Sequence, residues 1–468
     1  MSAHRPAAFE KFAQFRRNVT EVMALSWPIV ISMLSYTAMD LADTIFVGWL
    51  GTTQLAAVGL ATTVFFVLNG FFYGTLQGIT VVTSQAEGAG RRRRAVSSAI
   101  AGLWLAVPFG LFVLGLIFFH TTIFAVMGGE AEVQALAGDY FVIRAVGAGF
   151  WFAMLVVCNH YQGLGDTRTP MVLNIAAHSI NVILDPLLIF GIGPFPAMGV
   201  EGAALATVIA QFVGMAIALA HFFRGRLACS FAQARARSQE AIKNVAPAVL
   251  RLGIPIGVHN AVGLLAFGVF TAVLARMGTV ELAAHQIALK VVSVSFLPGH
   301  GVAQAASILA GQRVGAGHFD QVKEVLKASL FVALTLMGGL GVIFFFFHGP
   351  ITSVFTADVD TAALAGSLLI VAALFQLTDA TVMVTSQTLK GTGDTRFTMF
   401  AGITTSWVIM LPSAYFMGFV LGWGAVGAWL ALVVEIAVLS PILLARFYSG
   451  AWRKFAERER RDMAAARD

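Results

Sequence analysis

The chain has 468 residues, of which 58% are hydrophobic and only 12% are charged, with a formal net charge of +6 and a mean hydropathy of +0.81. A soluble domain carries about 25% charged residues, so this composition excludes a water-soluble protein and predicts an integral membrane protein. The two cysteines, Cys158 and Cys229, are too few for a disulfide framework or a cysteine zinc site.

Apolar runs long enough to span a bilayer, which takes about 20 residues in a helix, follow one another along the chain. They cover residues 22–48, 55–83, 96–119, 133–159, 171–191, 202–223, 246–275, 282–309, 325–347, 361–387, 398–420 and 425–446. The first run is too long for the core of a signal peptide, so it is expected to stay as a spanning helix. The sequence therefore predicts an all-α integral membrane protein with twelve transmembrane helices.

The distribution of positive charge predicts the orientation of these helices. If the N-terminus is cytoplasmic, the inner segments are 1–21, 84–95, 160–170, 224–245, 310–324, 388–397 and the tail from about 446. All 30 lysines and arginines lie in or directly beside those segments except Arg144, Arg276 and Lys290. Cytoplasmic loops are enriched in lysine and arginine, so both termini are expected inside, and the run Arg91–Arg94 is interpreted as a topology anchor near anionic lipid rather than a nucleic-acid site.

Short phrases recur along the chain at an offset of 225 to 228 residues. The clearest pair is GLGDTRTP at 163–170 and GTGDTRFT at 391–398. Other matching pairs are Trp27-Pro28 with Ile254-Pro255, Leu50-Gly51-Thr52 with Met277-Gly278-Thr279, the phrase at 85–90 with that at 312–317, and the phrase at 199–203 with that at 424–428. The repeat indicates two duplicated halves.

Each half contains six helices, an even number, so the halves share one orientation. We therefore predict two six-helix bundles related by a pseudo-twofold axis along the membrane normal, an arrangement found in transporters. The predicted parts are a cytoplasmic N-terminal segment (1–21), the N-terminal lobe (22–223), a cytoplasmic linker (224–245), the C-terminal lobe (246–446) and a charged cytoplasmic tail (447–468).

The repeated GxGDTR phrase is interpreted as a tight turn between helices. It lacks the lysine and hydroxyl residue that end a phosphate-binding loop, and it lacks the clustered ligands of a metal site. Glycine would allow a reversed backbone, aspartate would cap the next helix, and arginine would face the inner interface.

Several phrases resemble the multidrug and toxic compound extrusion (MATE) family from about residue 20 to 446. They are ADTIFVGWLG (42–51), QLAAVGLA (54–61), YQGLGDTRTP (161–170), NVILDPLLIFG (181–191), GVEGAALAT (199–207), ELAAHQIA (281–288) and FQLTDATVMVTSQTLKGTGDTR (375–396). The resemblance implies a secondary antiporter, with no catalytic residue and no cofactor, that exports organic cations or amphiphilic drugs in exchange for H+ or Na+.

Acidic residues deep in apolar runs are functional candidates because a charge there costs about 2.5–3.5 kcal/mol on insertion scales. Asp40 and Asp43 share one face of the first run, since they are three residues apart. Asp185 follows Asn181 by one turn and precedes Pro186, which frees a backbone carbonyl. A proton or Na+ could be held at that position.

The resemblance implies the role of each candidate in the first half. Asp43, Asn181, Asp185 and Thr207 match the polar cluster of the family's N-terminal lobe. Asp43 and Asp185 are then the expected coupling acids, Asn181 and Thr207 support them, and Asp40 is expected to modulate them. If the coupling ion is Na+, its expected ligands come from Asp43, Asn181 and Asp185.

The second half has fewer acids. Asp379 matches the acid of the phrase FQ-x-x-D in sodium-linked relatives, whereas the seventh run carries His259 and Asn260 but no acid. Lys290 is a candidate to neutralise Asp379, so these four residues are predicted to form a second cation or drug site. Glu435, His178 and His285 are weaker candidates, and His285 is expected to be a packed hydrogen-bonding residue.

Three other functions fit the sequence less well than antiport. A lipid-linked oligosaccharide flippase of the same superfamily needs cavity cations, for which Arg144 and Lys290 are the candidates. An intramembrane prenyltransferase using Asp40-x-x-Asp43 lacks a second acidic loop, and a passive structural protein leaves the deep acids without a role. The expected protein is a monomer in lipid, in a bacterial inner membrane, that binds small organic cations and no nucleic acid.

Overall fold

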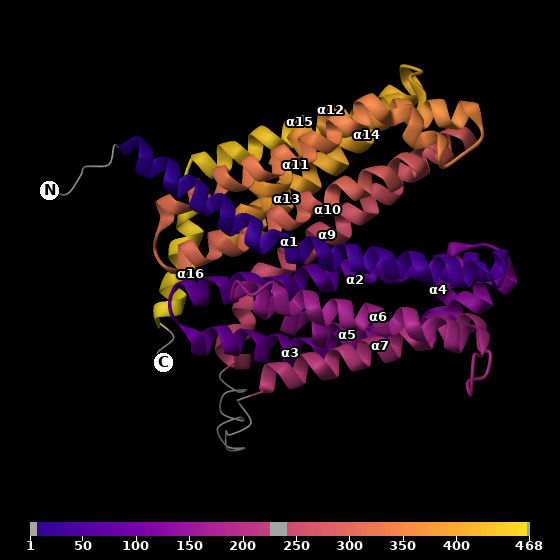
Figure 1. The fold of residues 1–468 in the computed structure, drawn as a ribbon, viewed down its shortest axis with the longest axis horizontal. Helices are drawn as coiled ribbons and strands as arrows, with labels where there is room; N and C mark the ends of the chain where they lie inside the picture. Colours follow the sequence, from indigo (N-terminus) through magenta and orange to yellow (C-terminus); the bar gives the residue numbers. More distant parts are fainter. Residues whose placement is uncertain (1–6, 225–240, 466–468) are drawn as a thin grey trace. The chain divides into compact units, whose positions relative to one another are not determined.

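The computed structural model describes residues 7–224 and 241–465, and its helices confirm the predicted fold class. Twelve helices in the described part of the chain are long and apolar enough to cross a membrane. They appear in the predicted order (Figure 1). The chain is therefore an all-α integral membrane protein.

The helices of the first half extend beyond the apolar runs. The bounds are α1 Ala7–Gly48, α2 Thr52–Gly88, α3 Arg92–Gly115 continued by η1 Leu116–Phe119 and α4 His120–Met127, α5 Ala131–Gly163, α6 Arg168–Phe190 and α7 Gly199–Phe223. The predicted N-terminal segment 1–21 is thus largely part of α1 from Ala7 onward. Hydropathy marks only the length of helix that lies in lipid, so it misses the polar turns that continue the same helix.

The second half repeats this order with irregular turns in its fifth spanning element. The bounds are η2 Ala241–Val245, α9 Ala246–Ala275, α10 Thr279–Gly315, α11 Phe319–Ser353, α12 Val359–Thr392, α13 Thr395–Thr404, η3 Thr405–Met410, α14 Leu411–Tyr415, η4 Phe416–Val420, α15 Gly424–Tyr448 and α16 Arg453–Ala465. The segments η3 and η4 are π-helical turns. Of the predicted linker 224–245, residues 225–240, including Cys229, lie outside the described residues.

Contacts divide the chain into two compact units. Unit 1 contains residues 1–30, 84–90 and 258–468, and unit 2 contains residues 31–83 and 91–257. The predicted lobes 22–223 and 246–446 follow the duplication, whereas the units exchange short segments between the halves. In each half the first helix changes unit two residues after its repeated proline, Pro28 in α1 and Pro255 in α9.

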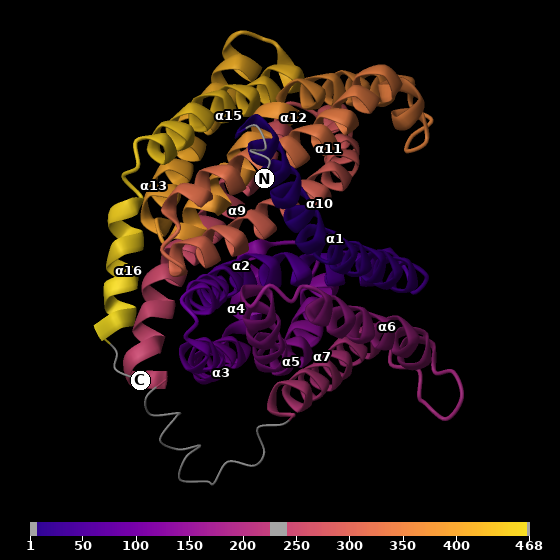
Figure 2. The ribbon, with the colours of Figure 1, turned by 60° about the vertical axis from the view of Figure 1, so that its left-hand side comes forward.

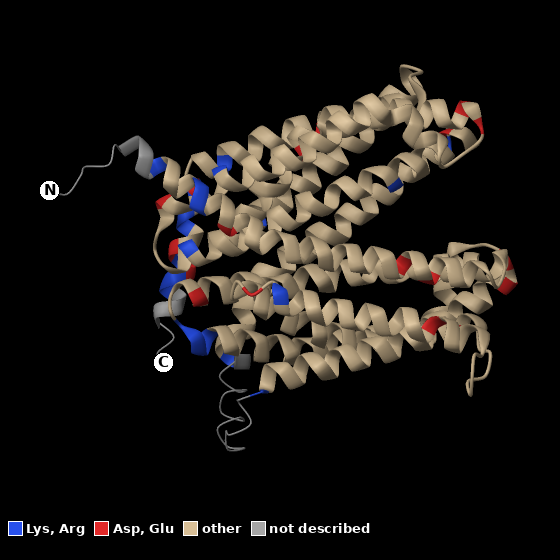
Figure 3. Cartoon of the chain, in the orientation of Figure 1, with Lys and Arg blue, Asp and Glu red and all other residues tan. Residues whose placement is uncertain are grey.

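Each unit is organised around its fourth spanning helix. In unit 2, α5 packs against α3, α6 and α7, and in unit 1, α12 packs against α10, α11 and α15. In both units the long helices run alongside one another (Figure 2). Within each unit, basic residues gather toward one end of the helices (Figure 3). The predicted orientation places the basic ends on the cytoplasmic side.

The two glycines of the repeated phrase have the same roles in both copies. A Cβ atom on Gly163 would lie 2.9 Å from the carbonyl oxygen of Thr80, and one on Gly391 would lie 2.2 Å from that of Ser307. The second glycine of each copy has a positive φ, which is +86° at Gly165 and +97° at Gly393. Hence the first glycine allows close helix packing and the second allows the left-handed turn.

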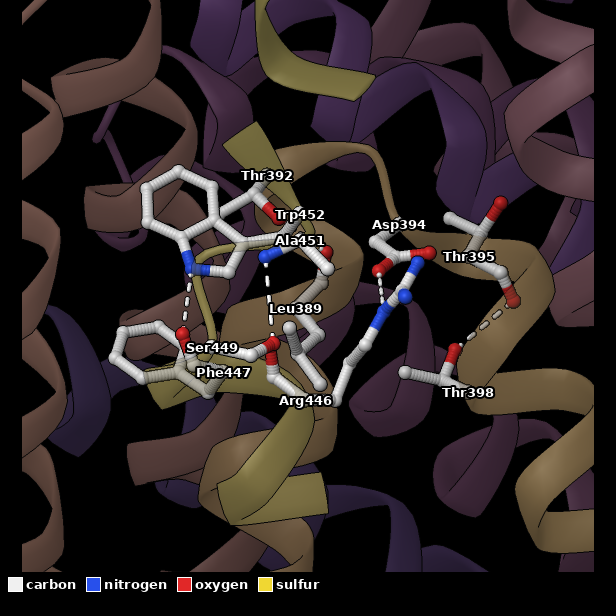
Figure 4. Close-up of polar contacts among 10 residues, drawn as sticks. All are labelled: Leu389, Thr392, Asp394, Thr395, Thr398, Arg446, Phe447, Ser449, Ala451 and Trp452. Atoms are coloured by element: carbon white, nitrogen blue, oxygen red, sulfur yellow. Dashed lines mark hydrogen bonds and ion pairs between the residues drawn. The ribbon is translucent and has the colours of Figure 1, made fainter. Parts of the chain in front are cut away.

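The aspartates of the phrase differ between the copies. Asp166 accepts hydrogen bonds from the backbone nitrogens of Arg168 and Thr169 at 3.1 and 3.0 Å, as a helix cap does. Asp394 makes no such cap. Its Oδ2 atom instead accepts a hydrogen bond from Nε of Arg446 at 2.8 Å (Figure 4). The capping prediction therefore holds for Asp166 and is wrong for Asp394.

Another repeated phrase contacts its own copy within unit 1. A Cβ atom on Gly88 would lie 1.9 Å from the carbonyl oxygen of Gln312, and one on Gly315 would lie 1.9 Å from that of Gln85. The four residues occupy equivalent positions in the two repeats. Such a reciprocal contact, in which each copy offers the same atoms to the other, is what a twofold relation produces.

Candidate coupling and binding site

In unit 2, polar side chains of α6 and α7 form a buried cluster. Asn181 and Asp185 are fully buried and Thr207 is 7% exposed. Nδ2 of Asn181 donates to Oδ1 of Asp185 and to Oγ1 of Thr207, both at 3.4 Å. The hydroxyl of Thr207 donates to the backbone oxygen of Ala203 at 3.0 Å. The structure thus brings together these three predicted residues.

Asp43 on α1 joins this cluster. Its carboxyl group lies within hydrogen-bonding range of the Asp185 carboxyl group. One oxygen on each of Asp43, Asp185 and Asn181 is buried with no hydrogen-bond partner among the described residues. Because buried polar atoms are normally satisfied, this group of oxygens is suited to hold a small ion or a proton.

Arg144 on α5 is the cation of the cluster, and the sequence did not assign it there. Its guanidinium interacts electrostatically with both Asp43 and Asp185. It also lies over the rings of Phe65 and Tyr140, with centroid distances of 5.4 and 5.9 Å. Its Nε and Nη1 atoms are buried without a partner among the described residues. An arginine inside an apolar run is a visible signal, but sequence alone does not reveal its neighbours.

Asp40 and His178 lie at the margin of the cluster. Asp40 is exposed and interacts electrostatically with Asp43 and with Tyr36, a residue that the sequence analysis did not select. Nδ1 of His178 is 2.9 Å from the Ser35 hydroxyl, and its ring meets Tyr36 edge-on at 5.8 Å. These contacts fit a secondary role for both residues.

In unit 1, the packed helices α12 and α15 each carry an acid in their apolar stretch, Asp379 and Glu435. The two carboxyl groups interact electrostatically, and Oδ2 of Asp379 is buried with no partner among the described residues. Glu435 accepts hydrogen bonds from Ser406 and Thr405, which belong to the π-helical turn η3. Turns of this type recur at functional sites. Glu435, a weaker candidate by sequence, is thus a better candidate for the second site in the structure, because it interacts electrostatically with Asp379.

The other predicted members of the second site are dispersed. Lys290 on α10 is exposed and makes no ion pair with Asp379 in the described part of the chain. His259 on α9 packs against Gly402, where an added Cβ would lie 2.2 Å from Cε1 of the ring. Its neighbour Asn260 is partly exposed. The proposed neutralisation of Asp379 by Lys290 is therefore not observed.

His285 on α10 is a packed hydrogen-bonding residue, as expected. Its side chain is fully buried. Nδ1 accepts a hydrogen bond from Nε1 of Trp429 at 3.1 Å, and Nε2 lies 3.2 Å from the hydroxyl of Thr271. Both ring nitrogens therefore have hydrogen-bond partners on neighbouring helix positions.

Lys390 was placed in an inner loop at 388–397 by sequence, but the structure places it in the last turn of α12. Its side chain is only 7% exposed. His259 and His300 both interact with it electrostatically. The hydropathy signal ended before this residue, because the polar residues near the end of α12 interrupt the apolar run.

Comparison with known proteins agrees with this architecture. The MatE family profile matches residues 28–187 and 255–416, more than half of the chain. The two matches start at the positions of the repeated prolines, one in each half. This independently supports the duplication that the repeated phrases indicated.

Individual relatives match along nearly their whole length. The chain is 30% identical over 440 residues to the probable multidrug resistance protein NorM of Thermotoga maritima, which covers 93% of each protein. It is 28% identical over 441 residues to the multidrug resistance protein MdtK of Yersinia pseudotuberculosis, covering 91% of this chain and 94% of that protein.

Solved structures share the fold. A crystal structure of MATE in the bent conformation superposes with a TM-score of 0.85 at 23% identity, covering 95% of this chain and 98% of that one. The crystal structure of the Vibrio cholerae MATE transporter VcmN in the bent form superposes with a TM-score of 0.83 at 19% identity. The match covers 96% of this chain and 99% of that one.

Proposed function

Because this chain belongs to the MATE family of multidrug transporters, we propose that it exports organic cations or amphiphilic drugs in exchange for protons. The observation that carries the proposal is the pair of acids Asp43 and Asp185 in unit 2, with unsatisfied buried oxygens beside Arg144. The names of the relatives support the drug class, since both are called multidrug resistance proteins.

The acid pair favours a proton over Na+ as the coupling ion. Two carboxyl groups form a hydrogen bond only when one of them holds a proton, because an ionised carboxylate accepts but does not donate. Arg144 balances the charge of the other carboxylate. With one shared proton and one guanidinium, the cluster is electrically neutral. A sodium ion in place of the proton would give the same net charge, but it would stay a separate cation that is repelled by the fixed guanidinium, whereas the proton becomes part of a neutral carboxyl group.

Release of the proton then changes the net charge of the buried cluster, and this change can drive the conformational step of transport. When the proton leaves, the cluster carries one net negative charge in a buried position, which is costly unless the surroundings rearrange or a cation arrives. Proton binding shifts a conformational equilibrium only if its free energy differs between the two conformations. The second acid pair, Asp379 and Glu435 in unit 1, is proposed to attract the cationic part of the substrate.

The energetics are sufficient for a single proton. A hundredfold export gradient requires about 2.7 kcal/mol, since each tenfold step costs about 1.4 kcal/mol. One charge crossing 100 mV supplies about 2.3 kcal/mol, and one pH unit supplies about 1.4 kcal/mol. We also propose that both termini are cytoplasmic, on the basis of the charge distribution, and that the protein is a monomer in a bacterial inner membrane, for which its bacterial relatives are the support.

Transport by purified protein in proteoliposomes tests the proposal. Uptake of ethidium is measured first under an imposed pH gradient and then under an imposed sodium gradient at equal pH. Uptake driven by the pH gradient alone is the expected result. Uptake driven by sodium alone contradicts proton coupling, and no uptake under either gradient contradicts cation export and directs attention to the flippase alternative.

A further inference from the structure

In unit 2, two hydrogen bonds between side chains connect α1 to α6 on the side of the acid pair that leads toward the start of α6. Nδ2 of Asn174 donates to the Ser32 hydroxyl at 2.7 Å, and Nδ1 of His178 lies 2.9 Å from the Ser35 hydroxyl. All four side chains are partly buried and belong to unit 2. They place polar groups between two spanning helices, where such groups are costly and often functional.

These contacts continue the register of the acid pair. The residue numbers of the partners differ by 142 for Ser32 with Asn174, by 143 for Ser35 with His178 and by 142 for Asp43 with Asp185. A constant difference means that α1 and α6 run parallel with one face of each turned to the other. On α6 the positions 174, 178, 181 and 185 follow steps of four, three and four residues, which keeps them on that face. We call these four residues, with Ser32 and Ser35, the polar stripe.

The second half of the chain shows that the fold does not require the polar stripe. At the repeat offsets of 227 and 228 residues, the positions that correspond to Ser32, Ser35, Asn174 and His178 hold His259, Val262, Gly402 and Ser406. A Cβ atom on Gly402 would lie 2.2 Å from Cε1 of His259, so the first of these pairs packs closely although glycine has no side chain to hydrogen-bond. In the second pair, valine replaces the hydroxyl of Ser35. The stripe thus belongs to the half that holds the acid pair.

The groups of the stripe can pass a proton in a defined order. An imidazole can take up one proton at Nε2 and give up another at Nδ1, which returns the ring to its neutral form as the other tautomer. Nδ1 of His178 faces the Ser35 hydroxyl, which can accept that proton while it passes on its own. Ser32 lies one turn further along α1. Because Asn174 donates to the Ser32 oxygen, the Ser32 hydroxyl hydrogen is directed onward.

Asn181 lies between His178 and the acid pair. His178 and Asp185 are seven residues apart, about 10 Å along the helix axis, so a water molecule has to link them. Oδ1 of Asn181 is buried without a hydrogen-bond partner among the described residues, and it can accept a hydrogen bond from such a water. The stripe then leads from the acid pair to within about two turns of Arg168, where α6 begins.

Titratable groups on the helices around His178 lie mainly beyond it, toward the acid pair. They are Tyr36, Asp40 and Asp43 on α1, Tyr140 and Arg144 on α5, and Glu201 and His221 near the two ends of α7. The ring of Tyr36 meets that of His178 edge-on at 5.8 Å. In the other direction, toward Arg168, the stripe residues Ser35, Ser32 and Asn174 are uncharged. A proton on the ring therefore has carboxyl groups on one side of the stripe and hydroxyl groups on the other.

We propose that His178 relays the proton from Asp43 and Asp185 toward the cytoplasmic start of α6, by way of the Ser35 hydroxyl. The proposal rests on the proposed function and adds the route by which its proton is released. It makes His178 a residue that determines how fast the proton leaves the acid pair. It leaves the affinity for the exported cation to other residues.

Two transport assays in proteoliposomes test the relay. Net uptake of ethidium under a pH gradient requires release of a proton in every cycle, whereas exchange of labelled for unlabelled ethidium at equal pH does not. His178→Asn retains a polar group for Ser35 but takes up no proton. We expect it to slow net uptake at least about tenfold, because a positioned proton-transfer group contributes about 10²–10⁴-fold, and to leave exchange unchanged.

The Ser35 hydroxyl provides a matched pair of variants. Ser35→Ala should slow net uptake as His178→Asn does, and Ser35→Thr, which keeps a hydroxyl group, should retain most of the rate. His221→Asn, at an exposed position near the end of α7, is the control and should alter neither assay. If His178→Asn does not fold, the Ser35 pair decides, and equal rates of net uptake in its two members overturn the relay.

The remaining outcomes separate the relay from the proposed function. An equal loss of net uptake and exchange in His178→Asn indicates a structural role and overturns the relay. Unchanged net uptake in that variant also overturns it, while proton-driven uptake by the unaltered protein leaves the proposed function intact. If the unaltered protein exchanges ethidium but shows no uptake under the pH gradient, proton coupling itself is refuted, and the relay with it.

Discussion

Arg446 on α15 holds Asp394, the aspartate of the second GxGDTR phrase, through a hydrogen bond of 2.8 Å from Nε to Oδ2. The Asp394 side chain is fully buried, and the guanidinium also lies over the rings of Phe397 and Phe455 at 4.6 and 5.6 Å. In the first copy, the hydrogen bonds that Asp166 makes with described residues all go to Arg168 and Thr169 at the start of α6. The same phrase thus has a local role in one half and joins two helices in the other.

Neutralising the two aspartates should therefore have unequal effects on stability. Asp394→Asn leaves the Arg446 charge without its partner and should cost about 3 kcal/mol, as for one half of a buried pair. Asp166→Asn should be nearly neutral, because asparagine caps helices about as well as aspartate. Thermal unfolding in detergent measures both. Equal effects would contradict the distinction, and Arg446→Gln added to Asp394→Asn should recover part of the loss.

Removal of either coupling acid should stop export without unfolding the protein. Asp43→Asn and Asp185→Asn each eliminate the carboxyl pair that would share a proton, so proton-driven ethidium uptake should fall to the level of empty liposomes. Asp40→Asn should cause a smaller loss, because Asp40 is exposed and lies beside the pair. Size-exclusion chromatography checks that the variants are folded. Unaltered uptake in either pair variant would refute the assignment.

Replacing Arg144 should change which ions the cluster accepts. In Arg144→Gln the fixed positive charge next to Asp43 and Asp185 is lost, so a sodium ion can be accommodated by the remaining oxygens. We expect sodium chloride to raise the melting temperature of this variant by about 2 °C more than choline chloride does, through ligand stabilisation. Arg276→Gln, at an exposed loop position, should show no such difference. A sodium effect of the same size in the unaltered protein would contradict proton selectivity.

The reciprocal glycine contact predicts a strong steric effect. Gly88→Ala and Gly315→Ala each place a Cβ atom 1.9 Å from a backbone carbonyl oxygen, so either should cost about 1–3 kcal/mol by overpacking. Gly268→Ala is the matched control, since nothing lies within 4 Å of its added Cβ. There the gain in helix propensity, about 1 kcal/mol, should leave the protein equally or more stable. Melting temperatures decide the comparison, and an unaffected Gly88→Ala protein would show that the helices can separate.

Much of this protein was determined by its sequence. Apolar runs of about 20 residues are rare in soluble proteins, so hydropathy alone was enough to predict the twelve spanning helices. The duplication followed from repeated phrases, because descent from one ancestral half keeps spacing even where residues change. Asp43, Asn181, Asp185 and Thr207 could be selected because polar residues in lipid are rare and costly.

The tertiary structure decided what those residues contact. Local spacing relates Asn181 to Asp185 on one helix, but only packing brings Asp43 and Arg144 to the same cluster from α1 and α5. It also decided that Lys290 is exposed while Lys390 is buried, although hydropathy had placed the first in a helix and the second in a loop. Whether a charged side chain meets an acid, a histidine or water depends on neighbours distant in the chain, and periodicity along a single helix does not contain that information.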